Sequence, residues 1–471
     1  MSARASAPLC TALLLAAACL LVSAQPLRAE TTMEAYVREG LRRNHTLRQK
    51  QFDLRRTLAE LSEARRAFYP SLSLHARYTW NRGGREMDVP VGDMLGEIYT
   101  ALNQVTPGAP YPTEFSDESV SLMPEREQET KVRLSQPIIL PRMWFNLRLS
   151  NRNTEIKELE VALFRRSLTA EIKEAYLNHW KAREAVQVYE ETLSVLRENL
   201  RVSRQLVAGG KATEDAVFRA QAEIAEVMQR RAEALRNRRV AASYLNFLAG
   251  RPLDDPVRVM DHGELSVPPE SDLETYTAHA LSMREELRLV RTAIGAQDEA
   301  IWLARSGNLP EVTAAFDYGF VGEEYRFTAD EDFWTATILL EWDLFDGLRS
   351  PARVGQARWR KKQLQAELQQ TQERIRLDVL RAYEDLNVAL GAIRSTEEAA
   401  ESSRKSFEIV SRKYEQGMAT QMEYMDARSR LTRAEIGRRI ALLDYHVQAA
   451  RLQSAAALGR HEAGALSTVP R

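Results

Sequence analysis

The chain has 471 residues, of which 28% are charged and 7% aromatic, and its mean hydropathy is −0.40. Such a composition is typical of long helices and coiled coils rather than of ordinary globular domains. Its 65 basic and 66 acidic residues leave a net charge of −1, which excludes a protein that binds nucleic acid through overall positive charge. The composition indicates no class of enzyme.

The first 29 residues have the pattern of a secretory signal peptide. An apolar stretch over residues 9–22 precedes two small-residue cleavage sites, which end at Ala24 and Ala29. Both cysteines, Cys10 and Cys19, lie in this segment; lipidation at Cys19 is disfavoured because apolar residues continue after it. The mature chain is therefore expected to contain no disulfide. After the predicted signal peptide, no run of 18 apolar residues predicts a membrane-spanning helix.

The rest of the chain is predicted to be a tandem duplication. A shift of 240 residues places residue 33 and those after it on the segment that begins at residue 273, and a shift of 207 places Gly210 and Thr213 on Gly417 and Thr420. The 33-residue difference predicts an insertion in the first half, over residues 81–130. The expected order is a signal peptide (1–29), a first repeat (30–251), a linker (252–272), a second repeat (273–460) and a tail (461–471).

Each repeat is expected to begin with a helix of about 36 residues that ends at Pro70 or Pro310. Apolar and polar residues then alternate with a period of two, which predicts four half-exposed strands. The alternating segments cover residues 71–80, 131–135, 311–320 and 334–345. The aromatic residues near their ends are Tyr78, Trp80, Tyr318, Phe320, Trp334 and Trp342.

Two interpretations of these strands are open. They could form a small antiparallel sheet packed on helices, which is the commoner meaning of alternation in soluble proteins. Alternatively, the strands could belong to an outer-membrane β-barrel, with the aromatic residues as its girdle. The polar face carries charged residues, among them Arg77, Arg133 and Asp317, which suit a water-filled lumen. The barrel is the favoured interpretation. Because four strands cannot close a barrel, the chain would have to pool its strands with other copies of itself.

A very long helix without proline follows the strands in each repeat. In the first repeat it covers residues 141–208, which is about 100 Å at 1.5 Å per residue. Seam positions at alternating spacings of four and three predict coiled-coil packing with neighbouring helices. The seam residues are Leu168, Ile172, Ala175, His179, Ala182, Val186, Tyr189, Leu193, Leu196, Leu200, Ser203 and Val207, with Ile375, Val379, Ala382, Leu386, Ala389, Ile393, Thr396, Ala400, Ser403, Phe407, Val410 and Tyr414 as their counterparts.

A glycine ends each long helix and a second helix runs back. Gly210 and Gly417 are expected to adopt the left-handed conformation that terminates a helix, and Thr213 and Thr420 to cap the returning helices.

Four segments in this order resemble the TolC-type outer-membrane efflux proteins: AFYPSLSLHARY, NLPEVTAAFDYGF, LLEWDLFDG and YEQGMATQMEYMDARSRL. The resemblance implies a homotrimer with a 12-stranded barrel in the outer membrane and a long α-helical tunnel through the periplasm. It also implies a periplasmic adaptor (membrane fusion) protein and an inner-membrane transporter of RND or ABC type. The helix turns would dock the adaptor, through Val207, Gly210, Thr213, Tyr414, Gly417, Met418 and Thr420. The first-half turn departs from the family pattern at Val207 and Arg219.

Acidic residues just after the turns form a further candidate site. Repeated around a three-fold axis, Glu214, Asp215, Glu423 and Asp426 would form rings of carboxylates that favour cations. The alternative is that acids at a helix N-terminus simply complement the helix dipole. No catalytic, cofactor-binding or metal-binding motif is recognised, and His179 is expected to pack in the seam.

The sequence therefore predicts a mainly α protein with a membrane β-barrel, in which long antiparallel coiled-coil hairpins form a periplasmic tunnel. The first functional hypothesis is a passive outer-membrane channel of a tripartite efflux or type I secretion system, which contacts outer-membrane lipid and extends into the periplasm. The second is a soluble periplasmic coiled-coil adaptor or scaffold. The third, a periplasmic hydrolase on a helical base, lacks any catalytic constellation.

Overall fold

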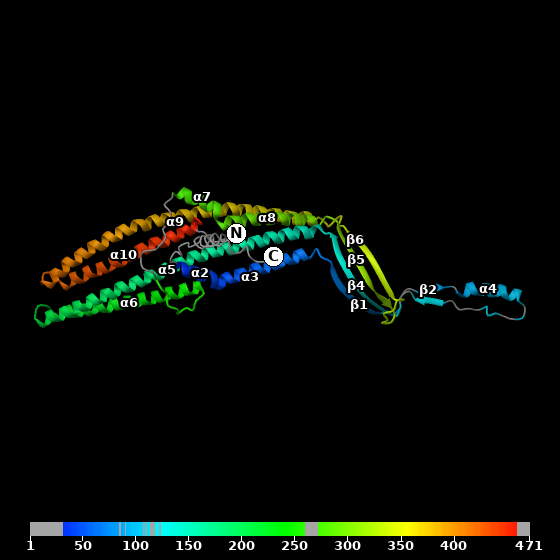
Figure 1. Ribbon diagram of the computed structural model, residues 1–471, viewed down its shortest axis with the longest axis horizontal. Helices are drawn as coiled ribbons and strands as arrows, with labels where there is room; N and C mark the ends of the chain where they lie inside the picture. The colour runs from blue at the N-terminus through cyan, green and yellow to red at the C-terminus, as the bar shows by residue number, and fades with distance from the viewer. Residues whose placement is uncertain are drawn as a thin grey trace, which may run out of the picture. The chain divides into compact units, whose positions relative to one another are not determined.

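A computed structural model describes residues 32–83, 86–89, 91–106, 108, 111–113, 118–121, 124–259 and 272–458. The expected signal peptide, the C-terminal tail and most of the predicted linker lie outside these residues. The elements in chain order are α2 (Thr32–Arg43), α3 (His45–Arg66), β1 (Ser71–Trp80), β2 (Glu86–Val89), α4 (Val91–Val105), β3 (Glu118–Ser121), β4 (Arg126–Ile139), α5 (Pro141–Ala208), α6 (Glu214–Ala249), α7 (Leu273–Met283), α8 (Glu285–Ser306), β5 (Glu311–Gly322), β6 (Asp332–Glu341), α9 (Arg349–Glu415) and α10 (Gln421–Ala455) (Figure 1).

The chain forms two compact units. The helical unit comprises the described parts of Met1–Arg56, Glu155–Thr292 and Leu364–Arg471, and the sheet unit comprises those of Thr57–Thr154 and Ala293–Gln363. Both halves of the sequence contribute to each unit, so the compact units are not the two sequence repeats. None of the described helices is long and apolar enough to cross a membrane.

The first helix of each half was predicted to be continuous, and this prediction is wrong. α2 ends and α3 begins on either side of Asn44, and α7 and α8 are separated at the equivalent residue, Arg284. The Asn44 side chain accepts a hydrogen bond from the amide of Leu47 (3.0 Å) and donates one to the carbonyl of Leu248 (2.9 Å). Asn44 thus acts as a buried cap that ties the break to the end of α6, because helix ends leave backbone groups that need partners.

The sheet unit contains a four-stranded antiparallel sheet with the order β1-β4-β5-β6. The predicted alternation is confirmed by the register, which aligns Leu72, Leu134, Phe316 and Ala336 in one row across the four strands. The adjacent row on the opposite face contains Ser73, Arg133, Asp317 and Thr335. The sheet therefore has one apolar and one polar face.

Two strands have bounds that differ from those predicted. β4 is longer than expected, because β1 pairs with its residues 126–135 and β5 with its residues 128–139. β6 ends at Glu341, so the predicted strand is wrong over residues 342–345. The reason is that Glu341 pairs with Glu311, the first residue of β5, and nothing further along β5 is left to pair with.

The insertion begins where it was predicted, after Trp80, but the predicted bounds of 81–130 are wrong over residues 126–130, which pair with β1 as part of β4. Residues 81–125 leave the sheet after Trp80 and return at Arg126, which pairs with Trp80. Within it, β2 and β3 form a separate two-stranded antiparallel ladder that carries α4 beyond the end of the sheet (Figure 1). The described parts of residues 81–125 are called the arm below.

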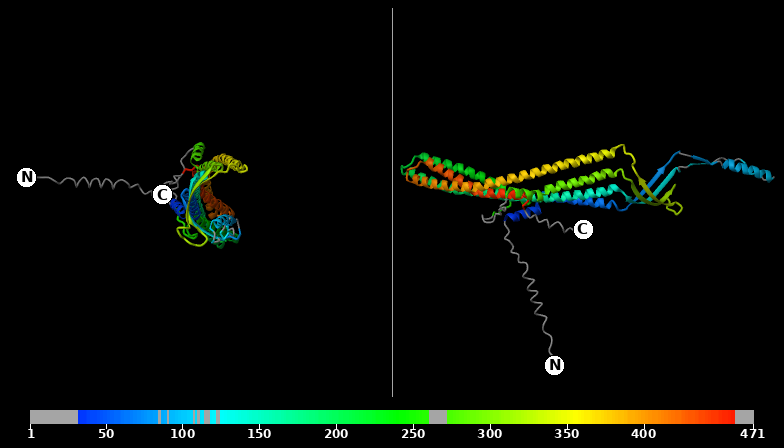
Figure 2. Two further views of the ribbon diagram at one scale, coloured as in Figure 1. Left: turned by 90° about the vertical axis from the view of Figure 1, so that its right-hand side faces the viewer. Right: turned by 90° about the horizontal axis from the view of Figure 1, so that it is seen from above.

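The helical unit is built from two long hairpins, α5–α6 and α9–α10, which lie side by side (Figures 1 and 2). The seam prediction is confirmed, since none of its twenty-four residues is exposed. The largest core cluster includes Trp180 and Tyr176 of α5 together with Leu245 of α6 and Leu443 of α10. The hairpins are thus held together mainly by buried apolar side chains, as seam spacing requires.

Candidate functional site

The turn between α9 and α10 is a Schellman-type helix end followed at once by a helix start. Gly417 has φ 75°, its amide donates to the carbonyl of Tyr414 (3.0 Å), and the amide of Met418 donates to that of Lys413 (2.7 Å). Thr420 then caps α10 with a full capping box. Its amide donates to the Glu423 carboxylate (2.7 Å), and its hydroxyl oxygen accepts from the amide of Glu423 (3.2 Å).

The turn between α5 and α6 has the same backbone but a weaker cap. Gly210 has φ 67°, its amide donates to the carbonyl of Val207 (3.0 Å), and the amide of Lys211 donates to that of Leu206 (2.8 Å). Thr213 takes the N-cap position, yet its side chain makes no cap hydrogen bond. The left-handed glycine caps are confirmed at both turns, whereas the predicted side-chain cap is confirmed only at Thr420.

Three of the four acidic residues near the turns pair within their own helix or with its cap. Hydrogen bonds from the amide and, to a smaller extent, the hydroxyl of Thr420 hold the pKa of the Glu423 carboxyl below its usual value. Asp426 pairs with Arg430 (2.8 Å) and Asp215 pairs with Arg219 (2.8 Å). Glu214, like Asp215, lies in the exposed first turn of α6. Glu214 and Asp215, for which the dipole alternative was raised, thus lie in a first turn, as does Glu423, and a pore-facing role for any of the four acids stays a prediction.

Tyr414, one of the predicted docking residues, packs inside the helical unit. Its ring lies 5.1 Å from that of Tyr424, and its hydroxyl is 3.3 Å from the Ser203 hydroxyl of α5. Gln421 adds a second contact between the hairpins by donating to Asn199 (3.1 Å). Tyr414 therefore contacts its own hairpin through Tyr424 and the α5–α6 hairpin through Ser203, whereas Met418 is 66% exposed.

Several residues at this contact were not singled out from the sequence. Tyr424 is buried, and burial raises the pKa of its hydroxyl; Arg428 lies over the Phe407 ring at 5.4 Å. A cavity of about 360 Å³ opens between the helices here, lined by Asn199, Val202, Phe407, Ser411, Tyr414 and Tyr424 among others. A signal was present, because Tyr424 and Arg428 lie four residues apart on one face of the helix that begins within the motif.

The aromatic residues of the sheet divide between its two ends. Tyr78, Trp80, Tyr318, Phe320 and Trp334 lie at the end from which the arm leaves, as the strand register shows. Trp342 lies past β6 at the opposite end, where its ring N–H donates to the carbonyl of Asn308 (3.1 Å). The sequence did not single out the aromatic pairs that accompany Trp342, which are Phe68 with Trp144 (5.3 Å) and Phe145 with Trp302 (5.9 Å).

The polar face of the sheet carries a connected set of charges. Arg133 makes a bidentate pair with Asp317, with both distances 2.7 Å. Glu129 accepts from Lys131 (2.5 Å) and lies 3.3 Å from Arg77. Pairs of this kind let a strand face hold charges without an unpaired ion. Among the described residues, no group of three or more His, Cys, Asp or Glu side chains is placed to hold a metal ion.

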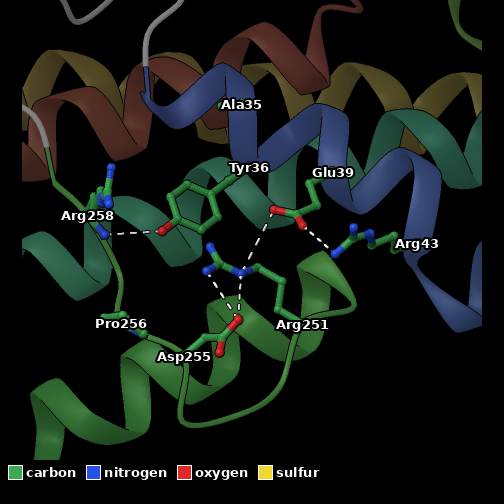
Figure 3. A pocket seen from close by; sticks show the side chains of 8 residues that line it. All are labelled: Ala35, Tyr36, Glu39, Arg43, Arg251, Asp255, Pro256 and Arg258. Atoms are coloured by element: carbon green, nitrogen blue, oxygen red, sulfur yellow. Dashed lines mark hydrogen bonds and ion pairs between the residues drawn. The ribbon is translucent and has the colours of Figure 1, made fainter.

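A cavity of about 490 Å³ in the helical unit lies between α2 and the end of the first half (Figure 3). Arg251 lies over the Tyr36 ring at 5.2 Å and is shared between Asp255 (3.3 Å) and Glu39 (3.9 Å). The Tyr36 hydroxyl accepts from the amide of Arg258 (3.2 Å). These contacts join the segment after α6 to α2, so the cavity belongs to a structural joint and not to a predicted site.

Paired hairpins that end in matching glycine turns, together with a two-faced four-stranded sheet, define a class of envelope channel proteins. A model of the outer membrane efflux protein family matches residues 37–251 and 277–460, and the chain belongs to this family. No curated protein matches the chain by sequence. The family resemblance, the fold class and the location in the outer membrane with extension into the periplasm are thereby confirmed.

Solved structures of outer-membrane channels have the same fold. The outer-membrane channel OprN matches with a TM-score of 0.74 and 17% identity, over 91% of this chain and 90% of that chain. The CmeC outer membrane channel of Campylobacter jejuni matches with a TM-score of 0.73 and 16% identity, over 90% of this chain and 85% of that chain. The open state of the MtrE channel of Neisseria gonorrhoeae matches with a TM-score of 0.70 and 17% identity, over 90% of this chain and 88% of that chain. The neighbours share the fold, and membership of the outer membrane efflux protein family disfavours the hypotheses of a soluble adaptor and of a hydrolase.

Proposed function

We propose that three copies of this chain form the outer-membrane channel of a tripartite efflux or type I secretion system. Substrates would pass through it without any chemistry of the channel itself, and the driving force would come from an inner-membrane transporter of RND or ABC type. The observation that carries the proposal is the sheet with two open edges. It has too few strands to close alone, and one of its faces is suited to lipid.

The open edges supply the argument for assembly. Within the described residues, β1 and β6 each pair with one strand only, so each presents a row of unpaired backbone groups. In a membrane, backbone groups have no water to bind and must all be paired. Pairing β1 of one copy with β6 of the next removes every edge, and three copies give a closed cylinder of twelve strands.

The two faces of the sheet supply the argument for orientation. Leu72, Leu74, Ile338 and Leu340 are all more than 60% exposed on the apolar face, which would meet lipid. The opposite face, with its Arg133–Asp317 pair, would line the aqueous interior. The aromatic residues at the two ends of the strands, Trp80 and Trp342 among them, would then lie at the membrane–water interfaces.

The hairpin tips are the proposed docking site for the adaptor. Each chain has two tips with the same backbone turn, so a trimer presents six. Met418, Gly417 and Thr420 at one tip and Lys211, Gly210 and Thr213 at the other are exposed. An exposed thioether such as that of Met418 adapts well to a partner surface. We infer that the adaptor binds to the surface that these residues form.

Two experiments test the proposal. The native mass of the detergent-purified mature protein is expected to be that of three chains; a monomer that stays soluble without detergent would contradict the channel. A photoreactive amino acid at Met418 or Lys211 is expected to capture a periplasmic adaptor in cells. The matched control is Tyr69, which is 69% exposed but lies at the sheet end of α3. Capture at Tyr69 and not at the tips would reverse the proposed polarity.

A further inference from the structure

The helix α4 in the arm has an apolar face that nothing in the described chain covers. Met94 is 65% exposed, Ile98 56% and Val105 82%, and Leu102 beside them is exposed as well. With 3.6 residues per turn, these four side chains fall on one side of the helix. A stripe of large apolar side chains is unusual on a part of a protein that lies beyond the sheet, and it indicates an interaction surface.

The opposite side of α4 is already occupied by the arm itself. Asn103 donates to the carbonyl of Tyr111 (3.0 Å) and accepts from its amide (2.8 Å), and the rings of Tyr99 and Tyr111 are 5.8 Å apart. At Gly96, a Cβ atom would come within 3.2 Å of the carbonyl oxygen of Thr113. The returning chain therefore takes one face of α4 and leaves the apolar one free.

The sequence of α4 favours another helix, rather than lipid, on the free face. Met94, Ile98, Ala101 and Val105 are spaced by four, three and four residues, which is the seam spacing of helices that pack side by side. Helices that lie on lipid surfaces are rich in Lys and Arg on their polar side. α4 has neither, and its only charged residues are Asp93 and Glu97.

We propose that this face binds the α4 helices of the other two copies in the trimer. The inference rests on the proposed function, because the trimer supplies the geometry. The arm leaves the sheet from the end of β1, an edge strand, so each arm begins beside a boundary between subunits. All three arms leave from the same end of the closed sheet. A helix of 15 residues is marginal alone, but tethering raises the local concentration of its partners to about the millimolar range.

Disulfide formation between arms tests the proposal. The protein is the mature chain, with Cys10 and Cys19 removed or replaced by serine, so that a single introduced cysteine reports alone. Ile98→Cys and Val105→Cys place the thiol on the apolar stripe. Gln104→Cys is the matched control, since residue 104 is exposed on the polar side of the same helix. The purified trimer is oxidised with copper phenanthroline, and linked pairs of chains are quantified on a denaturing gel.

The stripe variants are expected to form linked pairs about tenfold faster than Gln104→Cys, because only their thiols meet in the trimer. The native mass must remain that of one trimer. Equal rates at all three positions would overturn the proposal, and so would linkage that doubles the native mass, which would place the contact between trimers. A stripe thiol that labels with a lipid-phase reagent and forms no disulfide would place α4 on the membrane instead. A native mass of one chain before oxidation would refute the trimer itself. Failure of the proposed trimer can thus be told apart from failure of the proposed α4 contact.

Discussion

Glu423 distinguishes the two hairpin turns. Its counterpart 207 residues earlier is Ala216, which has no carboxylate to accept from the amide of the capping threonine. The backbones of the turns are nearly the same, yet α10 begins with a capping box and α6 does not. The repeat therefore preserves the glycine that reverses the chain and varies the side chains that fix where the next helix begins.

Replacing the two capping threonines should have unequal effects. Thr420→Ala removes a hydrogen-bonded cap and is expected to lower the free energy of unfolding by about 1 kcal/mol. Thr213→Ala removes no side-chain hydrogen bond and should stay within about 0.5 kcal/mol of the unchanged protein. Denaturant unfolding followed by circular dichroism measures both. Equal losses would mean that the capping box contributes nothing.

Two histidines predict a loss of stability in mild acid: His179 is buried and His446 is half-buried. Burial lowers the pKa of His179. The hydrogen bond to the Arg238 carbonyl opposes this shift, whereas the charges of Arg238 and Arg183 add to it. Burial also lowers the pKa of His446. A group whose pKa is lowered in the folded state stabilises the fold fully only above its ordinary value, which is about 6.5. The midpoint of denaturant unfolding should therefore fall as the pH drops from 7.5 to 5.5.

The double variant His179→Asn/His446→Asn should flatten this pH dependence, because asparagine can replace the ring N–H that donates to the carbonyl of Arg238 (3.2 Å) without gaining a charge. His45 is exposed at the start of α3, and His45→Asn should leave the slope as it is. If the double variant keeps the slope of the unchanged protein, other groups carry the acid sensitivity.

The hairpin turn depends on one backbone conformation, and Gly417 supplies it. Gly417→Ala forces a Cβ atom into the left-handed region and is expected to cost about 1 kcal/mol of stability. Gly391 is the matched control. It lies inside α9 with open space around its Cα, so Gly391→Ala should instead stabilise the protein by up to about 1 kcal/mol. Unfolding in urea measures the two changes, and a loss at both positions would refute the conformational argument.

The long helices and their turns could be predicted because their signals are local. The bounds of α5 agree with the prediction, since Pro141 and Gly210 mark its two ends and seam spacing runs between them. The break at Asn44 could not be predicted, because its cause is a contact with Leu248 from 204 positions away. No local pattern distinguishes an asparagine that interrupts a helix from one on its surface.

The strands were predicted in position but not in extent. Alternation identifies a strand and its two faces, whereas its length depends on the partner with which it pairs. β6 stops where β5 begins, and β4 is long because two neighbours pair with it. The same limit applies to Tyr414. The motif marked it as a docking residue, but its contact with Ser203 depends on how α5 packs against α9.

In the proposed trimer, the duplication gives six helical hairpins, whose turns alternate between a strong and a weak cap. The insertion breaks this near-symmetry only in the sheet unit. The second half joins β5 to β6 through residues 323–331, whereas the first half joins β1 to β4 through the arm. Because Trp80 and Arg126 already pair at the base of the arm, the four-stranded sheet is complete without it.

Removing the arm should therefore leave the assembly intact. Replacing residues 82–124 with the segment 323–331 converts the first connection into a copy of the second. The shortened protein is expected to keep the native mass of a trimer in detergent, because every strand pair of the four-stranded sheet and every seam contact of the helices remains. Native mass spectrometry checks this. Recovery of single chains would show that the arms drive assembly, so that contact between α4 helices would be a condition of the trimer and not its consequence.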